Sequence, residues 1–138
     1  MNTPFYTLAA VPTAKVRLRN FFAEEGDGPG WVLTAAPRFR PAGFDLSTSG
    51  YGKLVDGEYW EANSGNRKRV RLYQDGTLLF RARADSGFLG WGQSWENFSQ
   101  FPALNPVAVV EAHASFCAVY ALVLQHLSTA VHSVRFEL

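Results

Sequence analysis

The sequence predicts an α+β domain in which a curved antiparallel β-sheet packs against one long C-terminal helix. Strand-like stretches stand near both ends of the chain, FYTLAAVP at the start and VRFEL at the finish. The segment Arg69 to Arg83 alternates apolar and basic residues on both sides of a turn, which is typical of a β-hairpin. Asn105-Pro106 then opens a long apolar run, with Asn as the cap and Pro at the first helical position.

The first half of the chain predicts short elements separated by Gly- and Pro-rich loops. We expect a strand that Pro12 ends, then a short helix that Gly26 closes, although Val16 and Leu18 in that helix also suit a strand. Asp56-Gly57 predicts a tight hairpin turn. The expected elements are a strand at Phe5–Val11, a helix at Thr13–Glu25, strands at Trp31–Thr34 and Arg38–Leu46, and a hairpin at Lys53–Ala62.

The hairpin RVRLYQDGTLLFRAR allows two registers. A two-residue turn at Asp75-Gly76 would place Val70 opposite Arg81. A type I turn with Gly76 as a left-handed bulge pairs Tyr73 with Thr77 and sets apolar residues against each other. We choose the second register because a slip by one residue would turn a whole face over. Its pairs are Leu72 with Leu78, Val70 with Phe80 and Lys68 with Ala82, which leaves Arg67, Arg69, Arg71, Leu79, Arg81 and Arg83 on the other face.

The run after Asn105 predicts an amphipathic helix to about Leu127, followed by a last strand at Val131–Leu138. On a helical wheel, one apolar stripe contains Val109, His113, Phe116, Tyr120, Val123, Leu124 and Leu127. The opposite side contains Glu111, Ser115, Ala118, Leu122 and Gln125. Four polar residues interrupt the run, so we expect a buried helix and not a membrane span.

Composition limits the classes of function. The chain has 138 residues, 47% of them hydrophobic and 14% aromatic, which is enough to form one core. Its formal net charge is +1, so nucleic-acid binding would need a local basic patch. The one cysteine, Cys117, excludes a disulfide framework and is expected to be a small buried hydrophobe. Because the end stretches leave almost no tails, we expect a domain excised from a longer protein.

The strongest candidate site is the basic face of the hairpin. Six of the thirteen basic residues lie between Arg67 and Arg83, against one acid, Asp75. Arg69 and Arg81 should be directly opposed, which costs free energy unless an anion lies between them. That anion could be a phosphate, a nucleic-acid backbone or an acidic partner, or it could be internal, from Asp56, Glu58 or Glu61. The candidate anion- or partner-binding residues are Arg67, Arg69, Arg71, Arg81 and Arg83.

Two weaker candidates come from the aromatic segment and the helix. The stretch FLGWGQSWENFSQF could form an aromatic pocket for a small ligand, or it could simply cover one end of the sheet. His113 could act with a carboxylate, but Glu111 is two residues away and points elsewhere, and a satisfied core histidine is the simpler interpretation. No metal-ligand spacing, nucleophile elbow or phosphate loop is present, so we expect no metal, no cofactor and no catalysis. The candidate pocket residues are Trp91, Trp95, His113 and Tyr120.

Several segments resemble the C-terminal region of prokaryotic regulators that begin with a Schlafen-type AlbA ATP-binding domain. They are PFYTLAAVP, RPAGFDLSTSGYGKLVDGEYWEAN, RVRLYQDGTLLFRA and LNPVAVVEAHASFCAVYALVLQHL, which together span most of the chain. The resemblance implies a cytoplasmic accessory domain whose partner domain carries the nucleotide-binding or DNA-linked activity, and it carries over no functional residue. We therefore expect a non-catalytic regulatory or interaction domain, with other domains of the same polypeptide or further copies as partners. The alternatives are a small-ligand module with an aromatic pocket and an enzyme using His113; nucleic acid is not favoured as a partner, and no membrane is expected.

Overall fold

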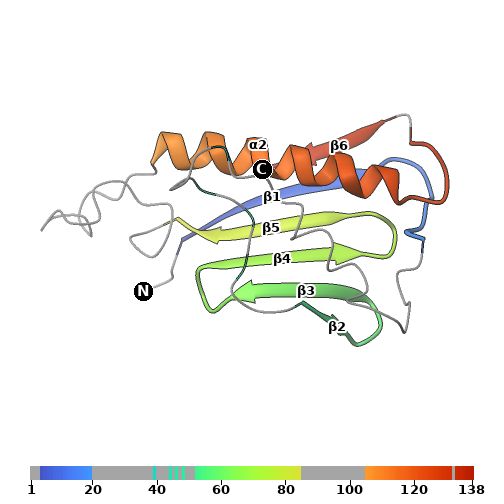
Figure 1. The fold of residues 1–138 in the computed structure, drawn as a ribbon, viewed down its shortest axis with the longest axis horizontal. Helices are drawn as coiled ribbons and strands as arrows, with labels where there is room; N and C mark the ends of the chain where they lie inside the picture. Colours follow the sequence, from blue (N-terminus) through green and yellow to red (C-terminus); the bar gives the residue numbers. More distant parts are fainter. Residues whose placement is uncertain are drawn as a thin grey trace, which may run out of the picture.

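The computed structural model describes residues 4–19, 39, 44, 46, 48, 52–84, 105–131 and 133–138. This part of the chain forms an open, curved antiparallel sheet of six strands with a helix on one face, which confirms the predicted α+β class (Figure 1). The strand order is β2-β3-β4-β5-β1-β6. The elements are β1 (Phe5–Pro12), β2 (Lys53–Val55), β3 (Tyr59–Ser64), β4 (Lys68–Tyr73), β5 (Leu78–Arg83), α2 (Pro106–Gln125) and β6 (Val134–Glu137).

Strands β2 to β5 form a meander, and the two ends of the chain complete the sheet beside it. β1 lies between β5 and β6, with Thr7 opposite Arg81 on one side and Ala10 opposite Phe136 on the other. The predicted strands at both ends are therefore confirmed, the last one over Val134–Glu137. This order brings outward-facing side chains of β1 next to the basic face of the hairpin.

The hairpin of β4 and β5 has the predicted bulged register. Gly76 has φ of +83°, and the Tyr73 amide donates to the Thr77 carbonyl at 2.9 Å. Val70 lies opposite Phe80 and Leu72 opposite Leu78, and all four side chains are fully buried. A Cβ at position 76 would lie 2.7 Å from Leu127 Cδ2, so glycine serves both the turn and its packing.

The Asp56-Gly57 turn between β2 and β3 is also confirmed. Asp56 has φ of +52° and Gly57 has φ of +70°, values that a tight hairpin turn demands and that Asp and Gly tolerate well. The Glu58 amide donates to the Val55 carbonyl at 3.0 Å across the turn. At the next turn Gly65 has φ of +53° and the Arg67 amide donates to the Ser64 carbonyl at 3.0 Å, which places Glu61 on β3 directly opposite Arg71 on β4.

The core lies between α2 and the inner face of the sheet. Asn105 caps the helix as predicted, since its side-chain oxygen accepts from the Val107 amide at 3.0 Å and from the Ala108 amide at 3.4 Å. α2 runs along β1 on this face (Figure 1). The buried apolar residues of the sheet and the helix are Leu8, Ala10, Trp60, Ala62, Val70, Leu72, Leu78, Phe80, Ala82, Ala108, Ala112, Phe116, Val119, Tyr120, Val123 and Leu127.

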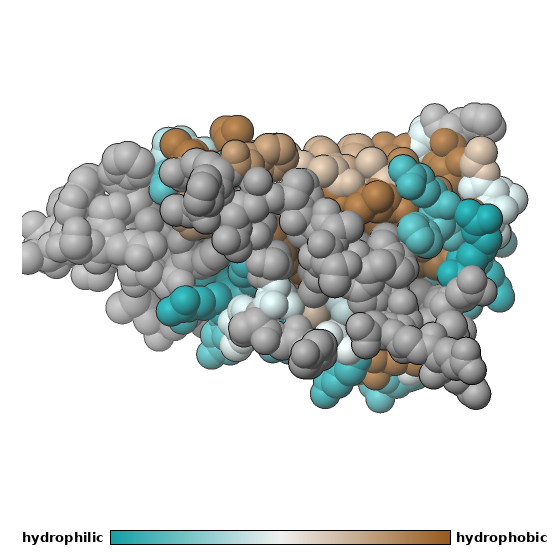
Figure 2. All heavy atoms as spheres, viewed as in Figure 1, coloured by the Kyte–Doolittle hydropathy of each residue, from teal (hydrophilic) through white to brown (hydrophobic). Residues whose placement is uncertain are grey.

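The predicted orientation of the helix is partly wrong. Glu111 and Ser115, expected on the outer side, are buried, and Cys117, expected inside, is exposed. The buried side of the helix instead includes the small residues Ala108 and Ala112, which belong to the core cluster. Apolar residues also lie on the outer side of α2, where Val110 is 67% exposed. Figure 2 shows this apolar surface over α2.

The prediction that polar residues make this helix too polar for a membrane span is wrong. By length and composition alone, Pro106–Gln125 is apolar enough to cross a bilayer, in spite of its polar residues. Eight of its residues are buried in the fold, among them Phe116, Val119 and Val123.

The prediction of a helix at Thr13–Glu25 is wrong for residues 13–19, which are not helical, and the rest of that range lies outside the described residues. The chain there bridges two parts of the fold: the Leu18 amide donates to the Gln74 carbonyl at 2.7 Å, and Leu18 forms an isolated bridge with Leu127. Val16 and Leu18 are buried while their neighbours are exposed, so the period is two and not that of a helix. Within the strand expected at Arg38–Leu46, the described positions Phe39, Phe44 and Leu46 are not in a strand, and Trp31–Thr34 lies outside the described residues.

Candidate anion-binding site

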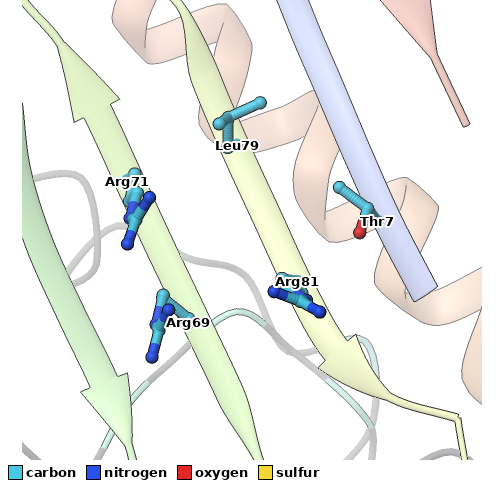
Figure 3. A pocket seen from close by; sticks show the side chains of 5 residues that line it. All are labelled: Thr7, Arg69, Arg71, Leu79 and Arg81. Carbon is cyan, nitrogen blue, oxygen red and sulfur yellow. The ribbon is translucent and has the colours of Figure 1, made fainter. Parts of the chain in front are cut away.

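A cavity of about 230 Å³ lies on the outer face of the sheet, opposite α2 (Figure 3). It is lined by residues from three adjacent strands: Thr7 from β1, Arg69 and Arg71 from β4, and Leu79 and Arg81 from β5. Three guanidinium groups and one hydroxyl therefore surround a small hollow whose floor includes one aliphatic side chain. Every polar side chain in this lining can donate a hydrogen bond.

The bulged register places these side chains together. Arg69 lies opposite Arg81, and Arg71 lies opposite Leu79. Thr7 lies opposite Arg81 on the other side of β5. Directly opposed like charges on neighbouring strands destabilise a sheet, so this arrangement favours an anion between the two strands.

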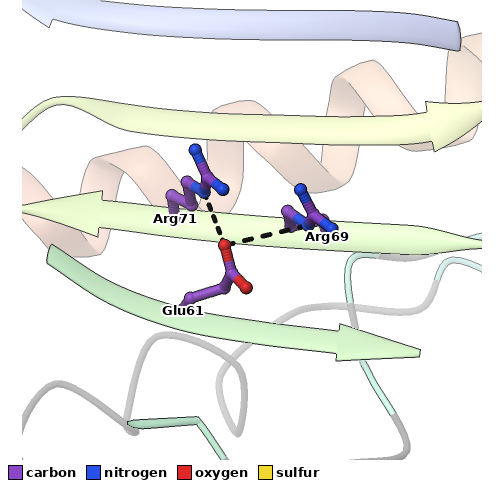
Figure 4. Close-up of polar contacts among 3 residues, drawn as sticks. All are labelled: Glu61, Arg69 and Arg71. Atoms are coloured by element: carbon purple, nitrogen blue, oxygen red, sulfur yellow. Dashed lines mark hydrogen bonds and ion pairs between the residues drawn. The ribbon is translucent and has the colours of Figure 1, made fainter. Parts of the chain in front are cut away.

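Glu61 is the internal anion that the sequence suggested. Its Oε2 atom lies 2.5 Å from Arg71 Nε and 3.7 Å from Arg69 Nε (Figure 4). Burial alone would lower the pKa of Arg71, but hydrogen bonds to Glu61 and Tyr73 and the Glu61 charge raise it. Arg71 is therefore charged at every accessible pH. Asp56 and Glu58, the other candidate acids, make no ion pair with any described residue.

In the part of the chain that the structure describes, one carboxylate faces two guanidinium groups, so these residues neutralise the site incompletely. Figure 4 shows that the ends of Arg69 and Arg71 extend past Glu61 toward β5, where the cavity lies. Arg81, on the far side of the cavity, makes no ion pair within the described residues. Among the described residues, the lining thus carries three positive charges, and Glu61 supplies the one negative charge at its border.

Aromatic rings hold two of the guanidinium groups in place. Arg81 Cζ lies 3.8 Å from the centroid of the Phe5 ring, and Arg71 Cζ lies 4.7 Å from the Tyr59 ring. Tyr59 in turn contacts Tyr73, with ring centroids 5.2 Å apart. Such stacking limits the rotamers of the arginines before any ligand arrives, which reduces the entropy cost of binding.

The two remaining candidate arginines lie at the end of this face. Arg67 is exposed in the turn between β3 and β4, and its carbonyl accepts the Arg83 amide at 2.9 Å. Arg83 lies opposite Phe5. Neither lines the cavity, so of the five predicted arginines the structure brings together Arg69, Arg71 and Arg81.

His113 has the satisfied, structural environment that was the simpler interpretation of the sequence. Its Nδ1 lies 2.8 Å from the Val109 carbonyl oxygen, which can only accept, so Nδ1 carries the proton. The Tyr6 hydroxyl, 2.8 Å from Nε2, then donates to the unprotonated nitrogen. Burial raises the pKa of the Tyr6 phenol, so it remains a donor. Glu111 has a different partner, since its Oε2 accepts a hydrogen bond from the Phe44 amide at 2.9 Å.

The other pocket candidates do not meet in the described part of the chain. Tyr120 is buried beneath the sheet with its ring edge-to-face to Phe136 at 6.0 Å, and its hydroxyl has no hydrogen-bond partner among the described residues. Burial, and then the charge of Asp75, raise the pKa of Tyr120 to about 12. Trp91 and Trp95 lie outside the described residues. Among the residues described, no three metal-binding side chains come close together.

Thr7, Phe5 and Tyr59 belong to the site and were missed from the sequence. All three alternate outward along their strands, so the pattern assigns them to a face but not to a neighbour. Comparisons of the chain with protein-family models, curated proteins and solved structures found no match. The resemblance to the regulators with a Schlafen-type AlbA domain therefore remains a prediction.

Proposed function

We propose that this chain is a non-catalytic interaction domain whose outer sheet face binds a phosphate-type anionic group of a partner molecule. The observation that supports it is the incomplete neutralisation of the cavity formed by Arg69, Arg71 and Arg81, with Glu61 as the one carboxylate in contact among the described residues. Guanidinium groups are suited to oxyanions because their planar N–H donors match the oxygen geometry. The Thr7 hydroxyl adds a further donor at the same cavity.

A binding role fits this face better than catalysis. The cavity contains no nucleophile with a base beside it, since its polar lining in the described part of the chain consists of three arginines and one threonine. The best candidate base, His113, lies on α2, on the other side of the sheet from the cavity. Its ring nitrogens are hydrogen-bonded to the Tyr6 hydroxyl and the Val109 carbonyl. A role as a regulatory domain of a larger cytoplasmic protein follows from the resemblance and is part of the same proposal.

Removal of two facing arginines tests the proposal. The Arg69→Ala/Arg81→Ala variant should bind inorganic pyrophosphate and heparin at least about tenfold more weakly, because charge-assisted hydrogen bonds are lost on both sides of the cavity. The matched control is Lys15→Ala/Arg17→Ala, which removes two exposed cations from a segment outside the sheet. Equal binding by wild type and both variants would reject the proposal, as would equal losses in the two variants.

A further inference from the structure

β6 forms one edge of the sheet and is strongly exposed. It pairs with β1 on one side, and in the strand order of the described residues no strand follows it on the other (Figure 1). Phe136 is 57% exposed and Leu138 is 86% exposed. Arg135 and Glu137 are paired with each other on the opposite face, with Nε and Oε1 2.6 Å apart. An open edge with exposed apolar residues is a surface on which another strand can add.

The sequence of this edge is complementary to itself. When VRFEL is placed antiparallel to a second copy with Phe136 at the centre, every cross-strand pair matches. Arg135 then lies opposite the partner's Glu137, and Phe136 lies opposite the partner's Phe136. Val134 lies opposite the partner's Leu138, so one face of the new pair is apolar and the other carries opposite charges. Both kinds of pair stabilise neighbouring antiparallel strands.

We propose that β6 pairs with β6 of a second copy of this chain, about a two-fold axis through Phe136. The Phe136 ring is already held edge-to-face against Tyr120 of α2, so it is oriented before the partner arrives. In this symmetric contact each copy uses the same patch, as a closed dimer requires.

The other edge of the sheet does not have this property. β2 has three residues, Lys53, Leu54 and Val55. Antiparallel self-pairing centred on Leu54 would put Lys53 opposite the partner's Val55, which matches a charge with an apolar side chain. A lysine on an edge strand is a common feature that prevents such pairing. Self-association is therefore assigned to β6.

The dimer has a consequence for the proposed anion site. Paired residues of antiparallel strands share a face, so both helices lie on one side of the joined sheet and both arginine cavities lie on the other. Two cavities that face the same way can bind two anionic groups of one partner, which raises the apparent affinity without new contacts. The dimer itself does not depend on the anion site.

Charge reversal at β6 tests the inference. Sedimentation velocity from about 5 µM to about 500 µM should show a concentration-dependent monomer–dimer equilibrium for the wild type, as expected for a small interface. Arg135→Glu and Glu137→Arg should each weaken dimerisation at least about tenfold, because like charges then face each other. An equimolar mixture of the two variants should form heterodimers, since both charged positions of one variant are then acidic and face two basic positions of the other. Lys53→Glu at the opposite edge serves as the control and should leave the equilibrium unchanged.

Each outcome is decisive once circular dichroism shows that the variants are folded. A wild type that stays monomeric over this range, variants that dimerise as well as the wild type, or a mixture that does not associate would each overturn the inference. Restored association in the mixture would show that the charged pairs form between two copies, because neither variant retains the internal Arg135–Glu137 contact.

Discussion

Glu61 competes with any anion that binds the arginine cavity, so its neutralisation should increase binding. The Glu61→Gln substitution keeps the size of the side chain and an oxygen that can accept from Arg71 Nε. It removes the charge that lies 2.5 Å from Arg71 and 3.7 Å from Arg69. The anion would then meet an uncompensated pair of guanidinium groups.

The expected magnitude follows from Coulomb's law. If the bound anion lies one guanidinium beyond the carboxylate, about 7 Å away, two unit charges repel by about 2.4 kcal/mol at an effective dielectric constant of about 20. Screening at physiological ionic strength reduces this to about 1 kcal/mol, which corresponds to roughly fivefold tighter binding. The gain should shrink further as salt is added.

Isothermal titration with inorganic pyrophosphate measures this effect. The control is Glu58→Gln, which also removes one acid but from an exposed turn residue that makes no ion pair with a described residue. We expect tighter binding for Glu61→Gln and unchanged binding for the control. Equal or weaker binding by a folded Glu61→Gln protein would refute the view that this carboxylate occupies part of an anion site.

Two further predictions concern stability. Tyr120→Phe should stabilise the fold by about 1 kcal/mol in urea unfolding, because it removes a buried hydroxyl that has no partner among the described residues. The raised pKa of Tyr120, about 12, means that the wild type loses stability as pH rises from about 10 to about 12, where the unfolded phenol ionises first, and Tyr120→Phe should flatten this loss. Gly76→Ala should destabilise by about 2 kcal/mol, through its φ of +83° and its contact with Leu127. Gly65→Ala, with positive φ but open space, should cost about half as much; equal costs would contradict the packing role.

The hairpin could be predicted in register because its chemistry allows one good solution. A bulge at Gly76 matches four apolar residues with one another, and the other register opposes Val70 to an arginine. The structure shows this register, with the four side chains fully buried. Since the register determines which residues share a face, it also predicted the opposition of Arg69 and Arg81 at the cavity.

The orientation of α2 could not be predicted in the same way. Nearly every residue of this helix is small or apolar, so the helical wheel contains little contrast between its sides. The fold selects the side by shape, with Ala108 and Ala112 toward the sheet, and it finds a partner for the buried Glu111 in the Phe44 amide. Shape and long-range partners are not visible in a local pattern.

The rest of the site depended on strand order. Thr7 and Phe5 reach the arginines because β1 inserts between β5 and β6. Alternation along the strand assigns these residues to one face, but no local signal states which strand lies beside it. The contribution of Glu61 was foreseeable, because consecutive strands usually pair and the short turn between Ser64 and Lys68 places β3 beside β4.

The most direct measurement of the central claim is the response of individual arginine side chains to an anion. In a ¹⁵N-labelled sample, titration with inorganic pyrophosphate can be followed at each side-chain Nε–H resonance. We expect saturable shifts at Arg69, Arg71 and Arg81, which line the cavity, while Arg17 and Arg19, outside the sheet, stay unchanged. Small, unsaturated shifts spread equally over all arginines would show that the outer face has no anion site.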